Sequence, residues 1–542
     1  MMSGIAYETK RLDHLGIVAG ICREIGLAEV IDQRVGPSER QVSVGQATEA
    51  MVLNGLGFSS RALYLTPEFF ANKPVDLLVG EGITAEMLND DTLGRALDAL
   101  YEAGVTELFA AVALSGCRRY GLQQRYKHLD STSFHLHGAY DTAEPEREAV
   151  HITYGHSKEE RPDLKQVVVN LITSYRCAIP LWLEVLSGNS NDKRSFIATI
   201  DAYSGQMVEA DDSFWVVDSA LYSAENLRAL GERKWVSRVP QTIGLAQEWI
   251  AALAPEEMRP LDAPGYRGKL VEVTYGDVPQ RWLVVYSQTA DEREAKSFAR
   301  QLARQREQAE KQLRRLLQQT FASQADAREA LAKASRRWRY HQARATIEAI
   351  TGYAQPGRPP KGAEPQVLGY RLVGEVVEDE AVLAAAVRRR GKFIIATNEL
   401  DSEQMPPAAM LAVYKAQGVS VERGFRFLKD PMFFADSLFL KKPERIMALI
   451  MVMGLALLVY ALGERYLRQA LAAEKETIPN QVGKPTRRPT LRRVFQMFEG
   501  IDLFMVADGQ IIDQRVLNLT PVRLKIIALL GPAVKMCYLC DV

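Results

Sequence analysis

The chain has 542 residues, of which 47% are hydrophobic and 25% charged, and its 67 Lys and Arg residues balance 67 Asp and Glu residues. This length allows about three domains, and the composition excludes a disordered or fibrous chain. Zero net charge excludes a uniformly basic nucleic-acid-binding protein. Any basic surface that binds nucleic acid must therefore be local. Five cysteines are too few for a disulfide scaffold and favour a reducing cytoplasm.

The N-terminal sequence lacks the apolar segment of a signal peptide. The most apolar segment of the chain, residues 446–462, contains no charged residue and is flanked by Arg445 and Glu464. A membrane-spanning helix needs about 20 apolar residues. The segment therefore predicts a buried core helix in a protein without a membrane partner, and a membrane span is the alternative.

Residues 1–120 are predicted to form a domain of short helices. Ser43 is expected to cap one helix, Thr66 to cap a second just before a proline, and Asp90 or Asp91 to cap a third. Small helical domains often bind DNA or dimerise, although the pattern fits packing alone equally well. We expect this domain to bind DNA ends, to dimerise, or both.

Residues 121–240 change to strands that are later interrupted by helices. Two runs rich in β-branched residues are separated by a short turn, which predicts a hairpin. The order is strand, strand, strand, helix, strand, helix, strand, with strands expected at 125–138, 166–175, 179–188, 213–218 and 235–239.

Residues 241–400 depart from that order and are predicted to be an insertion with strands and a basic helical hairpin. Within it, residues 289–344 hold 14 Lys and Arg residues against 7 Asp and Glu residues. Such helices are either a solvated hairpin or an arm that faces DNA. Residues 401–475 are predicted to complete the core with helices. The remaining basic region, 476–542, includes the stretch 484–493, a phosphate-contacting loop or a solvated linker.

Three acids stand out by their positions. Asp130 lies in a predicted strand, Asp218 ends a later strand, and Glu422 lies on a predicted helix after the insertion. Each alone could be an ordinary turn or strand-end residue, but an acid in an apolar strand is costly to bury unless it is hydrogen-bonded or binds a metal ion. Converging carboxylates repel one another, and Mg²⁺ or Mn²⁺ relieves that repulsion. Two such ions can activate a nucleophile and stabilise the leaving oxygen of a phosphodiester.

Cations accompany the third acid. Arg426 and Lys429 follow Glu422 by four and seven residues, so a helix projects all three from one face. Such cations would contact DNA phosphates near a scissile bond. Arg423 is added from the same helix geometry. The alternative is a solvated helix surface with an ordinary ion pair.

Histidines near the first acid offer a different metal site. His135 and His137 project from one face of a strand, as zinc ligands can, and His128 is nearby. The strand has no obvious third ligand, although His151 and His156 are candidates. A glycine-rich phosphate loop before a helix is absent from the sequence, so an NTPase has no support.

Taken together, these segments resemble the DDE transposases of bacterial insertion sequences, in particular the insertion-sequence-four superfamily and its 1634-type branch. The resemblance covers nearly the whole chain. It is carried, in this order, by LNDDTLGRALDALYEAG, HLDSTSFHLHG, YGHSKEERPDLKQVVVNL, PLWLEVLSGNSND, FWVVDSALYSAENL and VERGFRFLKDP. It implies a mixed α/β fold: an RNase H-like catalytic core interrupted by a β-containing insertion with long helices, plus a helical N-terminal domain.

The resemblance also implies an activity and a site. Asp130, Asp218 and Glu422 would be the catalytic triad that binds two Mg²⁺ (or Mn²⁺) ions. The activity would be cut-and-paste transposition, with cleavage at the element ends and strand transfer into target DNA. The family signature places a tyrosine seven residues before the glutamate and a lysine seven after it. Lys429 matches, whereas Tyr414, the candidate tyrosine, lies eight residues before Glu422.

The implied partners are double-stranded DNA, both as terminal inverted repeats and as target, and a second copy of the chain, since two ends must be synapsed. The implied location is the bacterial cytoplasm, at the nucleoid. Two alternatives remain: a nuclease of the same fold that never joins strands, and a decayed derivative that binds DNA without cutting it.

Overall fold

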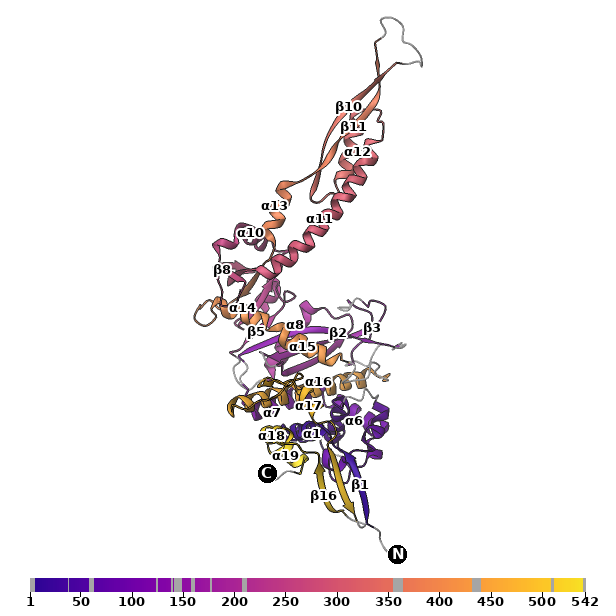
Figure 1. The fold of residues 1–542 in the computed structure, drawn as a ribbon, viewed down its shortest axis with the longest axis vertical. Coiled ribbons are helices and arrows are strands. Elements are labelled where there is room, and N and C mark those ends of the chain that lie inside the picture. Colours follow the sequence, from indigo (N-terminus) through magenta and orange to yellow (C-terminus); the bar gives the residue numbers. More distant parts are fainter. Residues whose placement is uncertain are drawn as a thin grey trace. The chain divides into compact units, whose positions relative to one another are not determined.

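The computed structural model describes residues 5–37, 39–57, 63–122, 125–137, 140, 149–156, 161–175, 178–206, 212–353, 364–430, 440–507 and 511–539. The chain divides into two compact units (Figure 1). The first comprises residues 1–237, 275–278 and 411–542, and the second comprises 238–274 and 279–410.

A sheet with the strand order β4-β3-β2-β5-β6 forms the centre of the first unit. Its first three strands pair antiparallel, whereas β5 pairs parallel to β2, and β6 parallel to β5. The predicted hairpin is confirmed as β3 and β4. The strands are β2 (Tyr126–Leu136), β3 (Lys165–Ser174), β4 (Pro180–Ser187), β5 (Phe214–Val217) and β6 (Trp235–Val239).

Helices cover both faces of this sheet. On one face, Tyr203 of α8 (Asp192–Gly205) makes edge contacts with Trp182 and Trp215. The other face is covered by α15 (Gln417–Leu428) and α16 (Pro443–Ala473). There, glycines allow close approach: a Cβ at Gly454 of α16 would lie 2.5 Å from Leu183 Cδ1. A further helix, α9 (Ala224–Ala229), joins β5 to β6 and is capped by Ser223.

The long apolar helix α16 is the centre of the helical part of the first unit. It packs against α1 (Leu15–Glu24), α3 (Val44–Gly55), α6 (Asp90–Glu102) and α7 (Val105–Arg119), as well as β4. By length and composition it could span a membrane, but its most apolar window is entirely buried in the fold. The helical part of the first unit also includes α2 (Leu27–Val35), α4 (Thr66–Phe70) and α5 (Val75–Leu78).

Helix capping in this region follows the sequence only in part. Ser43 caps α3 in a full capping box with Gln46, as predicted. The predictions for the other two helices were wrong. Asn89 has extended backbone angles and caps α6, because Asp90 is already helical. Thr66 is the first residue of α4, and its hydroxyl donates to Leu63 O at 2.7 Å instead of capping the helix.

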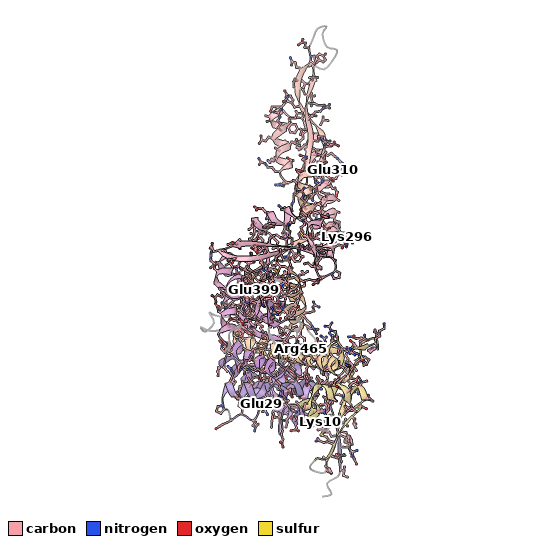
Figure 2. The ribbon with its side chains drawn as sticks, turned by 90° about the vertical axis from the view of Figure 1, so that its left-hand side faces the viewer. Lys10, Glu29, Lys296, Glu310, Glu399 and Arg465 are labelled. Carbon is pink, nitrogen blue, oxygen red and sulfur yellow. The ribbon has the colours of Figure 1, made fainter. Side chains whose placement is uncertain are left out.

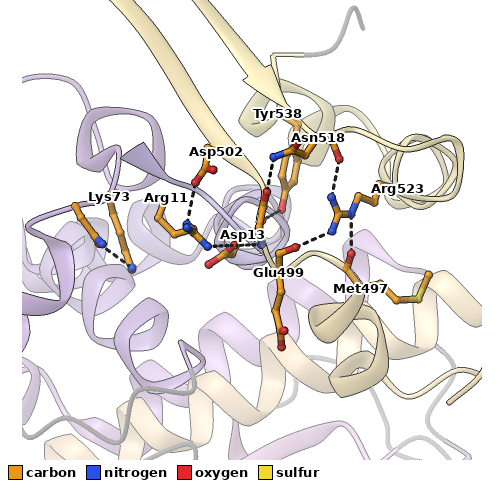
Figure 3. A network of polar contacts seen from close by, with 11 residues as sticks. Arg11, Asp13, Lys73, Met497, Glu499, Asp502, Asn518, Arg523 and Tyr538 are labelled. Atoms are coloured by element: carbon orange, nitrogen blue, oxygen red, sulfur yellow. Dashed lines mark hydrogen bonds and ion pairs between the residues drawn. The ribbon is translucent and has the colours of Figure 1, made fainter. Parts of the chain in front are cut away.

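Segments near the two ends of the chain pair in a small sheet. Residues 1–120 were predicted to form short helices, and this prediction was wrong for Ala6–Arg11, which form a strand. β1 (Ala6–Arg11) pairs antiparallel with β15 (Asp502–Ala507), which pairs with β16 (Ile511–Leu517). Figure 3 shows the polar network beside it, in which Arg11 binds Asp502 at 2.8 Å. The other C-terminal elements are β13 (Ile478–Pro479), β14 (Pro485–Thr486), α17 (Leu491–Met497), α18 (Pro521–Leu530) and α19 (Pro532–Cys537).

The second unit combines strands with a long helical arm. Its strands β12 (Lys392–Thr397), β9 (Val278–Ser287), β8 (Tyr266–Tyr275) and β7 (Arg259–Pro260) are neighbours in that order. The helix α11 (Gln288–Leu317) packs with α12 (Gln324–Ser335) and the hairpin β10 (His341–Gly352) and β11 (Gln366–Glu378). The remaining helices are α10 (Gly244–Ala252), α13 (Glu380–Arg389) and α14 (Pro407–Lys415), whose last residues belong to the first unit.

Candidate functional site

Two of the three predicted acids lie at the same level of adjacent strands. β2 and β5 run parallel, with Leu129 paired to Val217, so Asp130 and Asp218 are the next residues along each strand. Neighbouring strands are about 4.8 Å apart, and residues at one level of a parallel pair project to the same side. The register therefore places these two carboxylates side by side, although their positions in the sequence are far apart.

Backbone hydrogen bonds orient both carboxylates. Oδ1 of Asp130 accepts from Ser131 N at 2.8 Å, and Oδ1 of Asp218 accepts from Ala220 N at 2.8 Å. The hydroxyl of Ser237, on the neighbouring β6, donates to the main-chain oxygen of Asp218 at 2.9 Å. Both acids are half-buried. These bonds fix the point at which β5 ends and its acid leaves the sheet.

Asp130 faces the same side of the sheet as α15. Leu171 is the cross-strand partner of Asp130, and Leu183 is the partner of Leu171, so the three form one row across the sheet. A Cβ at Gly424 of α15 would lie 3.0 Å from Leu171 Cδ2. The helix that carries Glu422 therefore rests on the row of side chains that contains Asp130.

The C-terminal end of α15 confirms this placement. Lys429, the residue that ends the helix, has its Nζ 5.6 Å from the ring of Phe134. Phe134 follows Asp130 by four residues on β2 and therefore faces the same side. Glu422 thus lies on a helix that packs against β2 and β3, and Lys429 is the C-cap of that helix.

The side chain of Glu422 is exposed, and a glycine one turn earlier leaves room beside it. A Cβ at Gly418 would lie 3.3 Å from Glu422 Oε2. The helical backbone is interrupted at Ala416, between the end of α14 at Lys415 and the start of α15 at Gln417. Tyr414 consequently belongs to α14, and a different helix carries Glu422.

Metal-ligand geometry is not preformed in the described residues. Among them, no group of three or more His, Cys, Asp or Glu side chains lies close enough together to hold a metal ion. This holds for the acid triad and also for the zinc site considered for the histidines. His128 is buried beside the Tyr175 ring, at a centroid distance of 6.0 Å, and burial lowers its pKa to about 4. The central residues of the YGHSKEERPDLKQ stretch, 157–160, lie outside the described residues.

Arg423 makes an ion pair within the fold. Its Nη2 lies 2.6 Å from Oε1 of Glu464, a buried acid of α16. The same oxygen lies 2.8 Å from Arg468, and Oε2 of Glu464 accepts from Leu491 N at 3.0 Å. Burial disfavours the charge of Arg423, but the Glu464 carboxylate outweighs this and raises its pKa above the ordinary value. Sequence reasoning missed Glu464, since only the fold brings it to α15.

The basic stretch 484–493 lies beside the same helices. Arg468 donates to Pro489 O at 2.8 Å, and Arg492 lies 3.8 Å from Asp430, the residue that follows Lys429. Arg426, in contrast to Arg423, is exposed on α15. Cationic side chains from two separate segments thus lie near the end of α15.

Comparison with known proteins identifies the class. Residues 128–459, more than half of the chain, match the sequence model of the family described as "Transposase DDE domain". Residues 7–114 match "Domain of unknown function (DUF4277)". The chain therefore belongs to the DDE transposase family and is an enzyme of the transposase type.

Curated proteins give no match to the chain. Solved structures include one that is described as "Cryo-EM structure of piggyBac transposase synaptic complex with hairpin DNA (SNHP)". It is 8% identical, with a TM-score of 0.39 over 91% of this chain and 82% of that chain.

Proposed function

We propose that the chain is a metal-dependent transposase of the insertion-sequence-four superfamily, 1634-type branch, that cleaves DNA at the ends of its element and joins them to target DNA. The observation that carries the proposal is the register of β2 and β5, which sets Asp130 beside Asp218 on the face where α15 carries Glu422. The strand order β4-β3-β2-β5-β6, with three antiparallel strands followed by two parallel ones, supports an RNase H-like core.

Asp130, Asp218 and Glu422 would hold two divalent ions, Mg²⁺ or Mn²⁺. The donor chemistry fits, because all three side chains offer hard carboxylate oxygens and two of them lie side by side in register. When bound, the ions would activate water or a 3′-hydroxyl and stabilise the leaving oxygen. Backbone hydrogen bonds orient Asp130 and Asp218, and α15, the helix of Glu422, packs against β2 and β3.

The cations of α15 have two different roles in this proposal. Arg426, which is exposed, and Lys429, which lies over β2, would contact the phosphates of DNA near the scissile bond. Arg423 would instead fix α15 against α16 through Glu464. The irregularity at Ala416 can absorb the additional residue between Tyr414 and Glu422, so we retain Tyr414 as a candidate DNA contact.

The proposed partners are the double-stranded element ends and target DNA, which two copies of the chain would bring together in the bacterial cytoplasm. We assign residues 1–120 to end binding or dimerisation and 121–240 with 401–475 to the catalytic core. Residues 241–400 would be an insertion within that core. The C-terminal region 476–542 would add a basic loop beside α15.

A strand-transfer assay tests the proposal. Labelled DNA carrying the inverted repeats that flank the gene is incubated with a target plasmid and Mg²⁺, and cleaved and joined products are scored separately. Asp130→Asn, Asp218→Asn and Glu422→Gln should each reduce both products by at least about 10³-fold. The matched control is Asp212→Asn, an exposed acid just before the other end of β5, which should retain full activity.

The alternatives give different results in the same assay. Cleavage without joining by the wild-type protein would favour a nuclease. DNA binding without cleavage would favour a decayed derivative. Full activity in all three acid variants would refute the proposed triad.

A further inference from the structure

Seven cations lie on one side of the long helix α11. With about 100° between successive residues, they occupy an arc of about 100° on the helix surface. All are exposed, and they recur at nearly every turn: Arg293, Lys296, Arg300, Arg304, Lys311, Arg314 and Arg315. We call these seven residues the α11 basic stripe. One acid, Glu307, lies within the same arc of the helix, between Arg304 and Lys311.

The opposite side of α11 is the side that packs. Ala309 and Leu313 are buried against Val376 of β11. Three partly buried side chains pack against this cluster: Leu317, Leu331 of α12 and Trp338. Phe298 contacts the Tyr340 ring at a centroid distance of 5.1 Å. These apolar residues lie roughly opposite the stripe on the helix. The hydrophobic contacts of α11 therefore leave the basic stripe facing solvent. Figure 2 labels two residues of this helix, Lys296 of the stripe and Glu310.

The cations of the stripe lack the ion pairs that neutralise charge elsewhere in the arm. Within the described residues, the side chains of Arg293, Lys296 and Arg304 make no hydrogen bond or ion pair, nor do those of Lys311, Arg314 and Arg315. On the β10–β11 hairpin, by contrast, Arg371 lies 2.9 Å from Glu348 and Arg344 lies 3.6 Å from Glu375. The off-stripe Arg306 of α11 is likewise paired, with Glu310 at 2.9 Å.

Like charges follow one another in the first half of the stripe, whereas Glu292, Glu307 and Glu310 each lie four residues before a stripe cation. Lys296 and Arg300, and Arg300 and Arg304, are like charges four residues apart, an arrangement that costs about 0.2–0.5 kcal/mol per pair. A helix that needed only solubility could alternate its charges, as the hairpin does. An unpaired row of this kind is suited to a polyanion that is present only in a complex.

We propose that the α11 basic stripe binds the phosphate backbone of duplex DNA, outside the catalytic site and without reading its sequence. The inference rests on the proposed function, which supplies DNA as the substrate. From Arg293 to Arg315 the stripe extends about 33 Å, which is close to one turn of B-form DNA at about 34 Å. Lysine and arginine are the side chains that neutralise phosphates and release counterions.

The test measures the salt dependence of DNA binding by the full-length protein without divalent ions, using fluorescence anisotropy of a labelled 60-base-pair duplex of random sequence. The stripe variant carries four substitutions to glutamine, at Lys296, Arg300, Arg304 and Lys311. Its control carries four at exposed arginines of the same unit outside the stripe: Arg336, Arg337, Arg388 and Arg389. Circular dichroism and thermal unfolding compare the folding of the two variants.

The slope of log K against log salt should fall in magnitude by up to about 3–4 in the stripe variant, roughly 0.9 for each lost phosphate contact. Affinity near 0.15 M salt should fall on the order of 10²- to 10³-fold, with much smaller changes in the control. Equal affinity and slope in the folded stripe variant and wild type would overturn the proposal. So would DNA binding that is unchanged while binding to anionic lipid vesicles is lost.

A gain-of-charge variant keeps the test decisive if four substitutions impair folding. Glu307→Lys fills the gap in the stripe and should tighten binding about fivefold and steepen the slope by about 0.9. Glu329→Lys, the same charge change on α12, should have a smaller effect, and equal effects of the two would overturn the proposal. Catalysis is not needed for either readout. Full strand transfer by the acid variants, or cleavage without joining by the wild-type protein, would therefore refute the proposed function, whereas an unchanged salt dependence in the stripe variants would refute the stripe alone.

Discussion

The contact between α15 and the sheet gives a sharp test of how the candidate site is built. Gly424 lies two residues after Glu422, and a Cβ there would lie 3.0 Å from Leu171 Cδ2 and 3.3 Å from Leu457 Cδ2. Both distances are tighter than ordinary contacts, so Gly424→Ala should push α15 away from the row that contains Asp130. Alanine adds about 1 kcal/mol of helix propensity, and overpacking costs about 1–3 kcal/mol. The free energy of unfolding should therefore fall by no more than about 2 kcal/mol.

Activity should fall further than stability. A displacement approaching 1 Å between catalytic groups can cost about 10²-fold, so we expect strand transfer to fall about 10- to 100-fold in Gly424→Ala. Leu171→Val shortens the obstructing side chain and should restore much of that loss in the double variant, a coupling that a double-mutant cycle measures. Gly205→Ala on α8 is the control, because nothing lies within 4 Å of a Cβ there.

Two outcomes would contradict this role of Gly424. Full strand transfer by a folded Gly424→Ala protein would mean that this contact does not set the position of Glu422. Loss of activity that Leu171→Val fails to relieve would mean that the alanine acts elsewhere, for instance against Leu457 of α16.

Three further predictions concern stability, measured by urea unfolding. Burial raises the pKa of Glu49 from its ordinary 4.5 to about 8, so its contribution to stability is complete below pH 4.5 and is lost as pH rises through 8. Glu49→Gln should therefore match wild type near pH 5 and exceed it by roughly 2–5 kcal/mol at pH 8; equal pH profiles would contradict this. Glu464→Ala should cost about 3–5 kcal/mol because it leaves Arg423 and Arg468 without their buried partner, and a neutral result would show that the pairs contribute little. Arg523→Ala should cost about 1–3 kcal/mol, since Arg523 donates to Met497 O, Asn518 O and Glu499 O at 2.6–2.7 Å (Figure 3), and an unchanged midpoint would contradict that estimate.

Local patterns in the sequence predicted several elements well. The β-branched runs became β3 and β4, the capping box at Ser43 formed, and the apolar segment 446–462 became a buried part of α16. Each depends on interactions between residues close in sequence or on a simple hydrophobic period, so the signal is present in a short window. Local patterns did not fix the N-cap of α6, because Asn89, Asp90 and Asp91 are all residue types that cap helices. Packing decides that the helix begins at Asp90.

The order of residues specifies which side chains this protein can use: two strand acids, a helical acid with cations after it, and a basic period along α11. Which of these side chains meet depends on how the chain folds. Three contacts join residues that are distant in the chain. Asp130 and Asp218 lie side by side through strand register, Arg423 forms an ion pair with Glu464, and β1 pairs with β15. Strand register and buried ion pairs depend on the packing of whole elements, and no local period encodes their partners.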